Sequence, residues 1–116
     1  MNKTSPHVHG YLDYVTVVVF LLAPTLIGLT GFPAQLAYAL AGIHLVMTLV
    51  TDFPLGAVKL IPFTIHGWIE RAVGPLLVLV SLIPGFATDT AAQVFYLVIG
   101  VVIILVGLLT DYHGTR

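Results

Sequence analysis

The pentapeptide His-Gly-Tyr-Leu-Asp at residues 9–13 returns in the second half of the chain as His-Gly-Trp-Ile-Glu at residues 66–70. Two other pairs of segments recur in the same order: YALAG (38–42) with YLVIG (96–100), and LVTDF (49–53) with LLTDY (108–112). Self-similarity of this kind is the signature of duplicated structural units. The sequence therefore predicts two copies of one unit, and the repeated positions include most of the ionisable residues.

The composition of the chain indicates a lipid bilayer as its surroundings. Of the 116 residues, 59% are apolar and only 8% are charged, which is more apolar surface than a soluble domain of this size can bury. A helix needs about 20 apolar residues to cross about 30 Å of hydrocarbon, and residues 11–29, 33–51, 66–83 and 91–110 come close to that length. We expect an all-α membrane protein with four transmembrane helices in a single integral membrane domain, residues 1–116.

Each copy of the repeat is predicted to be one helical hairpin, because two spans return the chain to its starting side. We expect a first two-helix repeat at 9–53, an interfacial linker at 54–65 and a second two-helix repeat at 66–112. Since both hairpins start on the same side, a pseudo-twofold axis along the membrane normal should relate them. The linker contains two prolines, with apolar residues on either side of Lys59, which favours a segment lying in the membrane interface.

The basic residues predict the orientation. Lys3, Lys59, Arg71 and Arg116 lie in the N-terminal tail, the linker, the start of the third span and the C-terminal tail. These places share one side of a four-span chain, and cytoplasmic loops are enriched in Lys and Arg. We therefore expect both termini in the cytoplasm, with no cleavable signal peptide at the N-terminus. The chain has no cysteine, which excludes disulfides, thiolate ligands and thiol redox chemistry.

Four segments together resemble the SPW-repeat family of small bacterial integral membrane proteins. They are HGYLDY (9–14), LLAPTLIG (21–28), TDFPLGAVKLIPFTIHG (51–67), which is the most specific, and SLIPGF (81–86). The resemblance implies a pair of two-span repeats in a bacterial membrane, which we expect to be the cytoplasmic (inner) membrane. It implies no particular activity, so the function has to be inferred from the polar residues.

Six ionisable side chains are expected at one depth, near the cytoplasmic boundary of the membrane: His9, Asp13, Asp52, His66, Glu70 and Asp111. The His9–Asp13 and His66–Glu70 pairs are each four residues apart, so each pair shares one helical face. Gathered around one site, two histidines and four carboxylates would provide the ligand types of carboxylate metal bundles. The alternative is that each side chain faces headgroups and water near a helix end.

His44 is the ionisable residue deepest in the predicted hydrocarbon region. Together with Thr48 and Asp52 it forms a polar stripe at i, i+4 and i+8 along the second span. At 1.5 Å per residue, His44 lies about 12 Å deeper than Asp52. An ionisable group at this depth is a candidate for a functional site, and the alternative is a hydrogen bond that joins neighbouring helices. The second repeat has Val102 or Ile103 at this position.

Two classes of function remain. The first is a non-catalytic structural or accessory membrane module without a cofactor, forming a homo-oligomer or part of a larger membrane complex. Gly100 and Gly107, seven residues apart on the fourth span, would support its close helix packing. The second class binds a divalent metal, a haem between His9 and His66, or protons along the stripe that contains His44. The two serines lack a triad-like context, which disfavours a hydrolase, and four basic residues exclude nucleic-acid binding.

Overall fold

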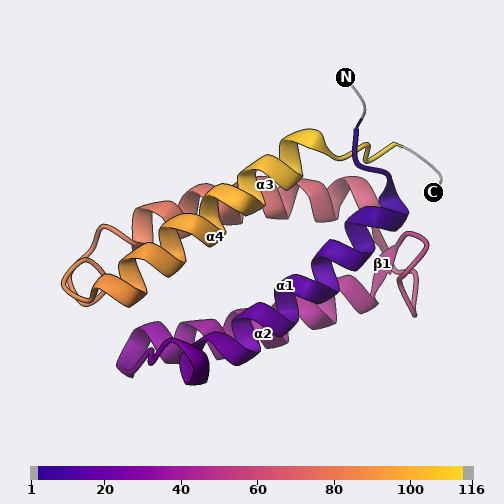
Figure 1. The fold of residues 1–116 in the computed structure, drawn as a ribbon. Coiled ribbons are helices and arrows are strands. Elements are labelled where there is room, and N and C mark those ends of the chain that lie inside the picture. Colours follow the sequence, from indigo (N-terminus) through magenta and orange to yellow (C-terminus); the bar gives the residue numbers. More distant parts are fainter. Residues whose placement is uncertain (1–2, 114–116) are drawn as a thin grey trace.

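The computed structural model describes residues 3–113, which form four helices (Figure 1). These are α1 (Pro6–Leu26), α2 (Gly31–Leu49), α3 (Phe63–Val80) and α4 (Thr90–Leu109). Each helix is long and apolar enough to cross a membrane, which confirms the prediction of an all-helical chain with four membrane-length helices. Two short strands that were not predicted, β1 (Thr51–Asp52) and β2 (Ile61–Pro62), pair in parallel between α2 and α3.

The helices begin earlier in the chain than the predicted spans, and the difference is largest for α1. Ser5 caps this helix by accepting a hydrogen bond from the backbone N–H of Val8 at 3.2 Å. Pro6 occupies the first turn, where backbone N–H groups have no acceptor within the helix, so the N–H that proline lacks is not needed. The segment interpreted from the sequence as a polar tail is therefore helical from Pro6 onward, and His9 lies within α1.

Neighbouring helices in the chain pack as two hairpins, α1 with α2 and α3 with α4 (Figure 1). Small residues allow close approach within the second hairpin. A Cβ added to Gly100 would lie 2.9 Å from the carbonyl oxygen of Gly74, and one added to Gly107 would lie 3.3 Å from Cγ of Arg71. Gly100 and Gly107 thus both face α3, Gly100 against its backbone and Gly107 against the stem of Arg71.

A single apolar cluster contains residues of all four helices. Near the loops that join the helices of each hairpin, Phe86 and Tyr96 are buried and their rings meet edge to face, with centroids 5.1 Å apart. The Tyr96 hydroxyl donates a hydrogen bond to the carbonyl oxygen of Pro33 at 2.6 Å, which joins α4 to α2. We call this the apolar end of the bundle.

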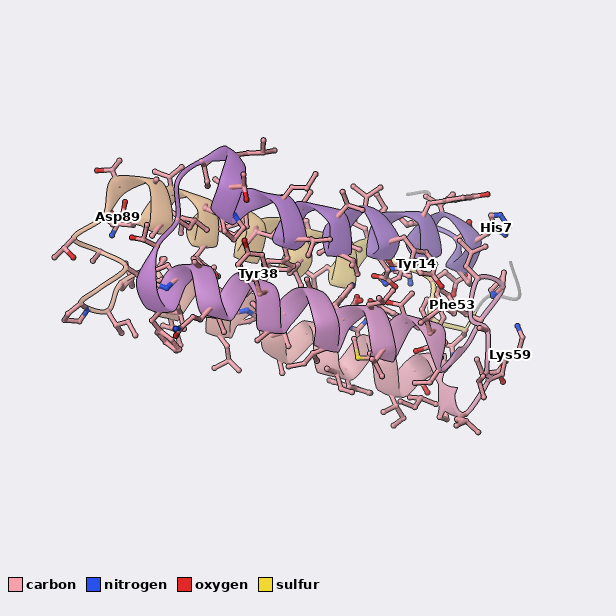
Figure 2. All side chains as sticks on the ribbon, turned by 90° about the horizontal axis from the view of Figure 1, so that it is seen from below. His7, Tyr14, Tyr38, Phe53, Lys59 and Asp89 are labelled. Atoms are coloured by element: carbon pink, nitrogen blue, oxygen red, sulfur yellow. The ribbon has the colours of Figure 1, made fainter. Side chains whose placement is uncertain are left out.

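The opposite end carries the linker and the segments next to both chain ends, and we call it the polar end. Figure 2 shows His7, Phe53 and Lys59 at this end and Asp89 at the other. The linker folds back on α2: the N–H of Ala57 donates to Leu49, and that of Leu60 to Val50. Thr4 pairs in the same parallel manner with Thr110 beyond α4. Of the cations used to predict the orientation, Arg116 lies outside the described residues.

Candidate metal site at the polar end

Two histidines lie side by side in the interior of the polar end. His9 on α1 and His66 on α3 are both 0% exposed, and their ring centroids are 5.5 Å apart. Glycine follows each histidine and allows close packing above it. A Cβ at Gly10 would lie 2.6 Å from Leu55, and one at Gly67 would lie 2.7 Å from Tyr112. The repeated His-Gly pair thus lets a neighbouring side chain pack directly against the backbone next to each histidine.

A threonine of the opposite hairpin orients each imidazole. Nδ1 of His9 lies 2.7 Å from the hydroxyl of Thr110, and Nδ1 of His66 lies 2.7 Å from that of Thr51. Each hydroxyl donates its single proton to the backbone carbonyl four residues earlier, at 2.6 Å. The hydroxyl can therefore only accept from the imidazole. Both histidines carry a proton on Nδ1, and both turn Nε2 toward the interior.

Two buried carboxylates fill the space that the Nε2 atoms face. Asp13 is 3% exposed and Glu70 is 4% exposed. Nε2 of His9 lies 3.1 Å from Asp13 Oδ1 and 3.0 Å from Glu70 Oε2. Nε2 of His66 lies 3.1 Å from Asp13 Oδ2 and 2.6 Å from Glu70 Oε1. Each carboxylate thus contacts both imidazoles, and the four residues form a closed cluster that joins α1 to α3.

The charge of this cluster has to be balanced, because ionised groups are costly away from water. With Nδ1 protonated, a neutral imidazole presents a lone pair on Nε2, and lone pairs facing two carboxylates would leave two negative charges buried. A proton on each Nε2 or one divalent cation among the four groups would restore neutrality. These four residues, His9, Asp13, His66 and Glu70, offer one ligand atom each, and the four atoms lie within 4.8 Å of one another.

One oxygen of the cluster lacks a hydrogen-bond donor. Within residues 3–113, Asp13 Oδ2 is a buried oxygen without a hydrogen-bond partner, although Nε2 of His66 is 3.1 Å away. Nε2 of His66 instead makes its hydrogen bond with Glu70 Oε1, at 2.6 Å. Buried polar atoms are otherwise nearly always hydrogen-bonded.

His44 contacts the cluster from α2. Its Nε2 lies 3.2 Å from Asp13 Oδ1, so it joins α2 to α1, as a hydrogen bond between neighbouring helices would. The stripe expected from His44 toward the membrane boundary is interrupted. The Thr48 hydroxyl donates to the carbonyl oxygen of His44 at 2.7 Å, and Asp52 lies beyond the end of α2 with its side chain exposed. His44 therefore belongs with the cluster rather than with a polar path along α2.

The structure brings together four of the six residues expected at one site and leaves out Asp52 and Asp111. Asp52 is exposed, and Asp111 is partly exposed and accepts a hydrogen bond from the N–H of His113 at 3.2 Å. Each aspartate follows a threonine in extended backbone, where successive side chains point to opposite sides. Thr51 and Thr110 are 0% and 3% exposed. In the repeated Thr-Asp pair, the threonine points into the site and the aspartate points away.

An aromatic shell separates the cluster from the surface. Phe53, Phe63 and Tyr112 are buried together, and the rings of Phe63 and Tyr112 both meet His9. Burial, reinforced by the charge of Glu70, raises the pKa of Tyr112. Its hydroxyl therefore stays protonated and donates to Glu70 Oε2 at 3.3 Å. No role was predicted for Thr51, Thr110 or Tyr112, although all three lie in the repeated LVTDF and LLTDY segments.

Comparison with known proteins does not relate this cluster to a site of known function. No family model matches the chain, and no curated protein or solved structure matches it either.

Proposed function

We propose that the chain is a non-catalytic four-span membrane module whose two hairpins are joined by a divalent metal ion bound to His9, Asp13, His66 and Glu70. The observation that carries this proposal is the fixed orientation of the two imidazoles. Both Nδ1 atoms donate to threonines, so in neutral imidazoles both Nε2 atoms, which here lie in hydrogen-bond contact with Glu70 Oε1 at 3.2 and 2.6 Å, would offer their lone pairs to one ion. Metal-bound histidines characteristically donate their other ring N–H to a neighbouring acceptor, which sets the tautomer.

The spacing of the ligand atoms fits a small tetrahedral ion. Ligands about 2.0–2.1 Å from zinc lie roughly 3.3–3.4 Å from one another in a tetrahedron. One ligand atom from each residue can be chosen so that all four lie within 4.8 Å of one another, and each Nε2 lies 2.6–3.1 Å from an oxygen of each carboxylate. Small movements of these side chains would accommodate the ion, and its two positive charges would neutralise Asp13 and Glu70. Imidazole nitrogen and carboxylate oxygen are both zinc ligands, and four protein donors would leave no open coordination position.

The geometry disfavours haem bound between the two histidines. Asp13 and Glu70 occupy the space between the two Nε2 atoms, and the cavity beside the cluster, lined by Asp13, His44 and Glu70 among others, has a volume of about 10 Å³. That is room for about one water molecule. A porphyrin would have to displace both carboxylates into surroundings that cannot solvate them.

Metal analysis of the protein purified in detergent tests the proposal. We expect about one zinc ion per chain, bound by nitrogen and oxygen ligands without sulfur, as X-ray absorption would report. His66→Gln should lose the metal, whereas His7→Gln, which changes an exposed histidine on α1, should retain it. A well-folded protein that contains no metal and takes up none would overturn the proposal and leave two protonated histidines as the counter-charge.

We further propose a bacterial inner membrane location, membership of the SPW-repeat family and a pseudo-twofold relation between the hairpins. The reciprocal contacts support this symmetry, since each histidine binds the threonine of the other hairpin. The orientation proposed has the polar end in the cytoplasm, because Lys3, Lys59 and Arg71 all lie there. The chain lacks cysteine, so single cysteines can report on each side. Cysteine at Lys59 should resist an impermeant thiol reagent in intact cells and cysteine at Asp89 should react, and the reverse pattern would contradict the orientation.

A further inference from the structure

A second polar site lies at the surface of the polar end, on the far side of Tyr112 from the metal cluster. It is a cavity of about 160 Å³ between the start of α3, the segment that precedes α1 and the segment that follows α4. The side chains that define its character are Lys3, Thr64, Trp68, Arg71, Asp111 and His113. Lys3 and Arg71 against Asp111 give it a net positive charge.

Arg71 is held in place while its charge remains uncompensated. The guanidinium carbon lies 5.2 Å from the ring centroids of both Trp68 and Tyr112, and Nε donates to the carbonyl oxygen of Gly107 at 3.4 Å. Within residues 3–113, Arg71 forms no ion pair with a carboxylate. An arginine positioned by two aromatic rings presents its terminal N–H groups in a fixed fork, which matches the oxygens of a phosphate group.

The cavity opens at the depth where lipid headgroups would lie. Trp68 is 65% exposed, as is typical of tryptophans in the interfacial belt of membrane proteins. Leu76 and Leu79, which lie beyond Arg71 on α3 and further from the polar end, are 56% and 59% exposed, so an apolar surface continues from the cavity along the helix. A ligand whose anionic group occupies the cavity can therefore pack its hydrocarbon chains against the adjoining surface of α3.

We propose that this cavity binds the phosphate group of an anionic phospholipid. Arg71 and Lys3 provide the positive charge, the Thr64 hydroxyl is a further donor in the cavity, and the acyl chains run along α3 away from the polar end, past Leu76 and Leu79. Basic pockets beside transmembrane helices recognise lipid headgroups through this combination of charge and apolar surface. Thr110 and Tyr112 line the cavity and also contact the cluster, but none of the four proposed metal ligands lines the cavity, so lipid binding and metal binding can be tested separately.

Quenching of Trp68 by brominated lipids provides a direct test, because this is the single tryptophan of the chain. In detergent, brominated phosphatidylglycerol should quench at a concentration at least about fivefold lower than brominated phosphatidylcholine, since one basic residue near an anionic surface contributes about that factor. The ratio between the two lipids within one variant is unaffected by any change in the intrinsic fluorescence of that variant.

Arg71→Gln should remove the preference for the anionic lipid, and Arg71→Lys should retain part of it. The matched control is Lys59→Gln, which removes a cation from the same end of the bundle but outside the cavity, where Lys59 donates to the carbonyl of Phe53. Equal loss in the Lys59 variant, or an unchanged preference in a folded Arg71→Gln protein, would overturn the proposal. Competition by millimolar inorganic phosphate without any lipid preference would show a site for free phosphate and overturn the lipid assignment.

Discussion

The two ends of the bundle join the hairpins by different interactions. At the apolar end, Phe86 and Tyr96 pack edge to face, and a neutral hydrogen bond connects Tyr96 to Pro33. At the polar end, four buried ionisable groups bring α1 and α3 together, and two threonines hold the imidazoles in place. Contact between the hairpins depends on the fit of side-chain shapes at the apolar end, whereas it depends on charge balance at the polar end.

This difference matters because the surrounding lipid is as apolar as the helix surfaces. Burial of apolar side chains between membrane helices provides little hydrophobic driving force, so close packing and polar contacts have to specify how helices associate. The apolar end can tolerate small changes in shape. The polar end cannot lose one charged group without leaving the others uncompensated, and its sensitivity to substitution should be correspondingly greater.

The largest effect is expected when the charge balance is broken. Glu70→Leu should lower the free energy of unfolding in detergent by about 3–5 kcal/mol, as is typical when one partner of a buried ionic group is removed. At the apolar end, Tyr96→Phe should cost only about 0.5–1.5 kcal/mol, the value of one neutral hydrogen bond. Denaturation of both variants in the same detergent measures the difference. Equal losses would show that the two ends are held with similar strength.

A smaller effect should follow when a threonine is replaced without changing the charge. Thr51→Val keeps the shape of the side chain but leaves Nδ1–H of His66 without its acceptor, at a cost of about 1–3 kcal/mol. Loss of such an orienting contact typically weakens metal binding about 10–100-fold, which competition with a chelator can measure. The neighbouring change Asp52→Asn should stay within about 0.5 kcal/mol. A larger effect at Asp52 than at Thr51 would contradict the orientation of the Thr-Asp pair.

Among the residues that touch the cluster, the smallest effect is expected at His44, which hydrogen-bonds Asp13 and whose ring meets that of His66 edge to face. If the residue serves only to join helices, His44→Gln should keep a donor for Asp13 Oδ1 and cost about 1 kcal/mol or less. His44→Leu removes that donor and should be the less stable of the two variants. Thermal unfolding and metal content distinguish the roles. Loss of metal in a stable His44→Gln protein would show that the imidazole is itself a ligand.

Much of the architecture was predictable from local features of the sequence. Long apolar runs identify membrane-length helices because hydrocarbon cannot solvate charged groups or free backbone, and the duplication indicated two hairpins. The spacing of His9 to Asp13 and of His66 to Glu70 placed each pair on one helical face, because helical periodicity depends only on neighbouring residues. The start of α1 was less evident, since Ser5, which caps the helix, and Pro6, its first residue, lie in a segment that reads as polar.

The arrangement of the site was decided by the tertiary structure. The repeated Thr-Asp pairs were visible in the sequence, yet whether Thr51 or Asp52 points inward depends on the extended backbone that follows α2 and pairs with β2. The contact of His9 with Thr110 joins residues near opposite ends of the chain, and no local pattern specifies such a contact. Local sequence therefore determined which residues share a helix face, whereas packing between the hairpins determined which of those faces meet and which polar groups lose contact with water.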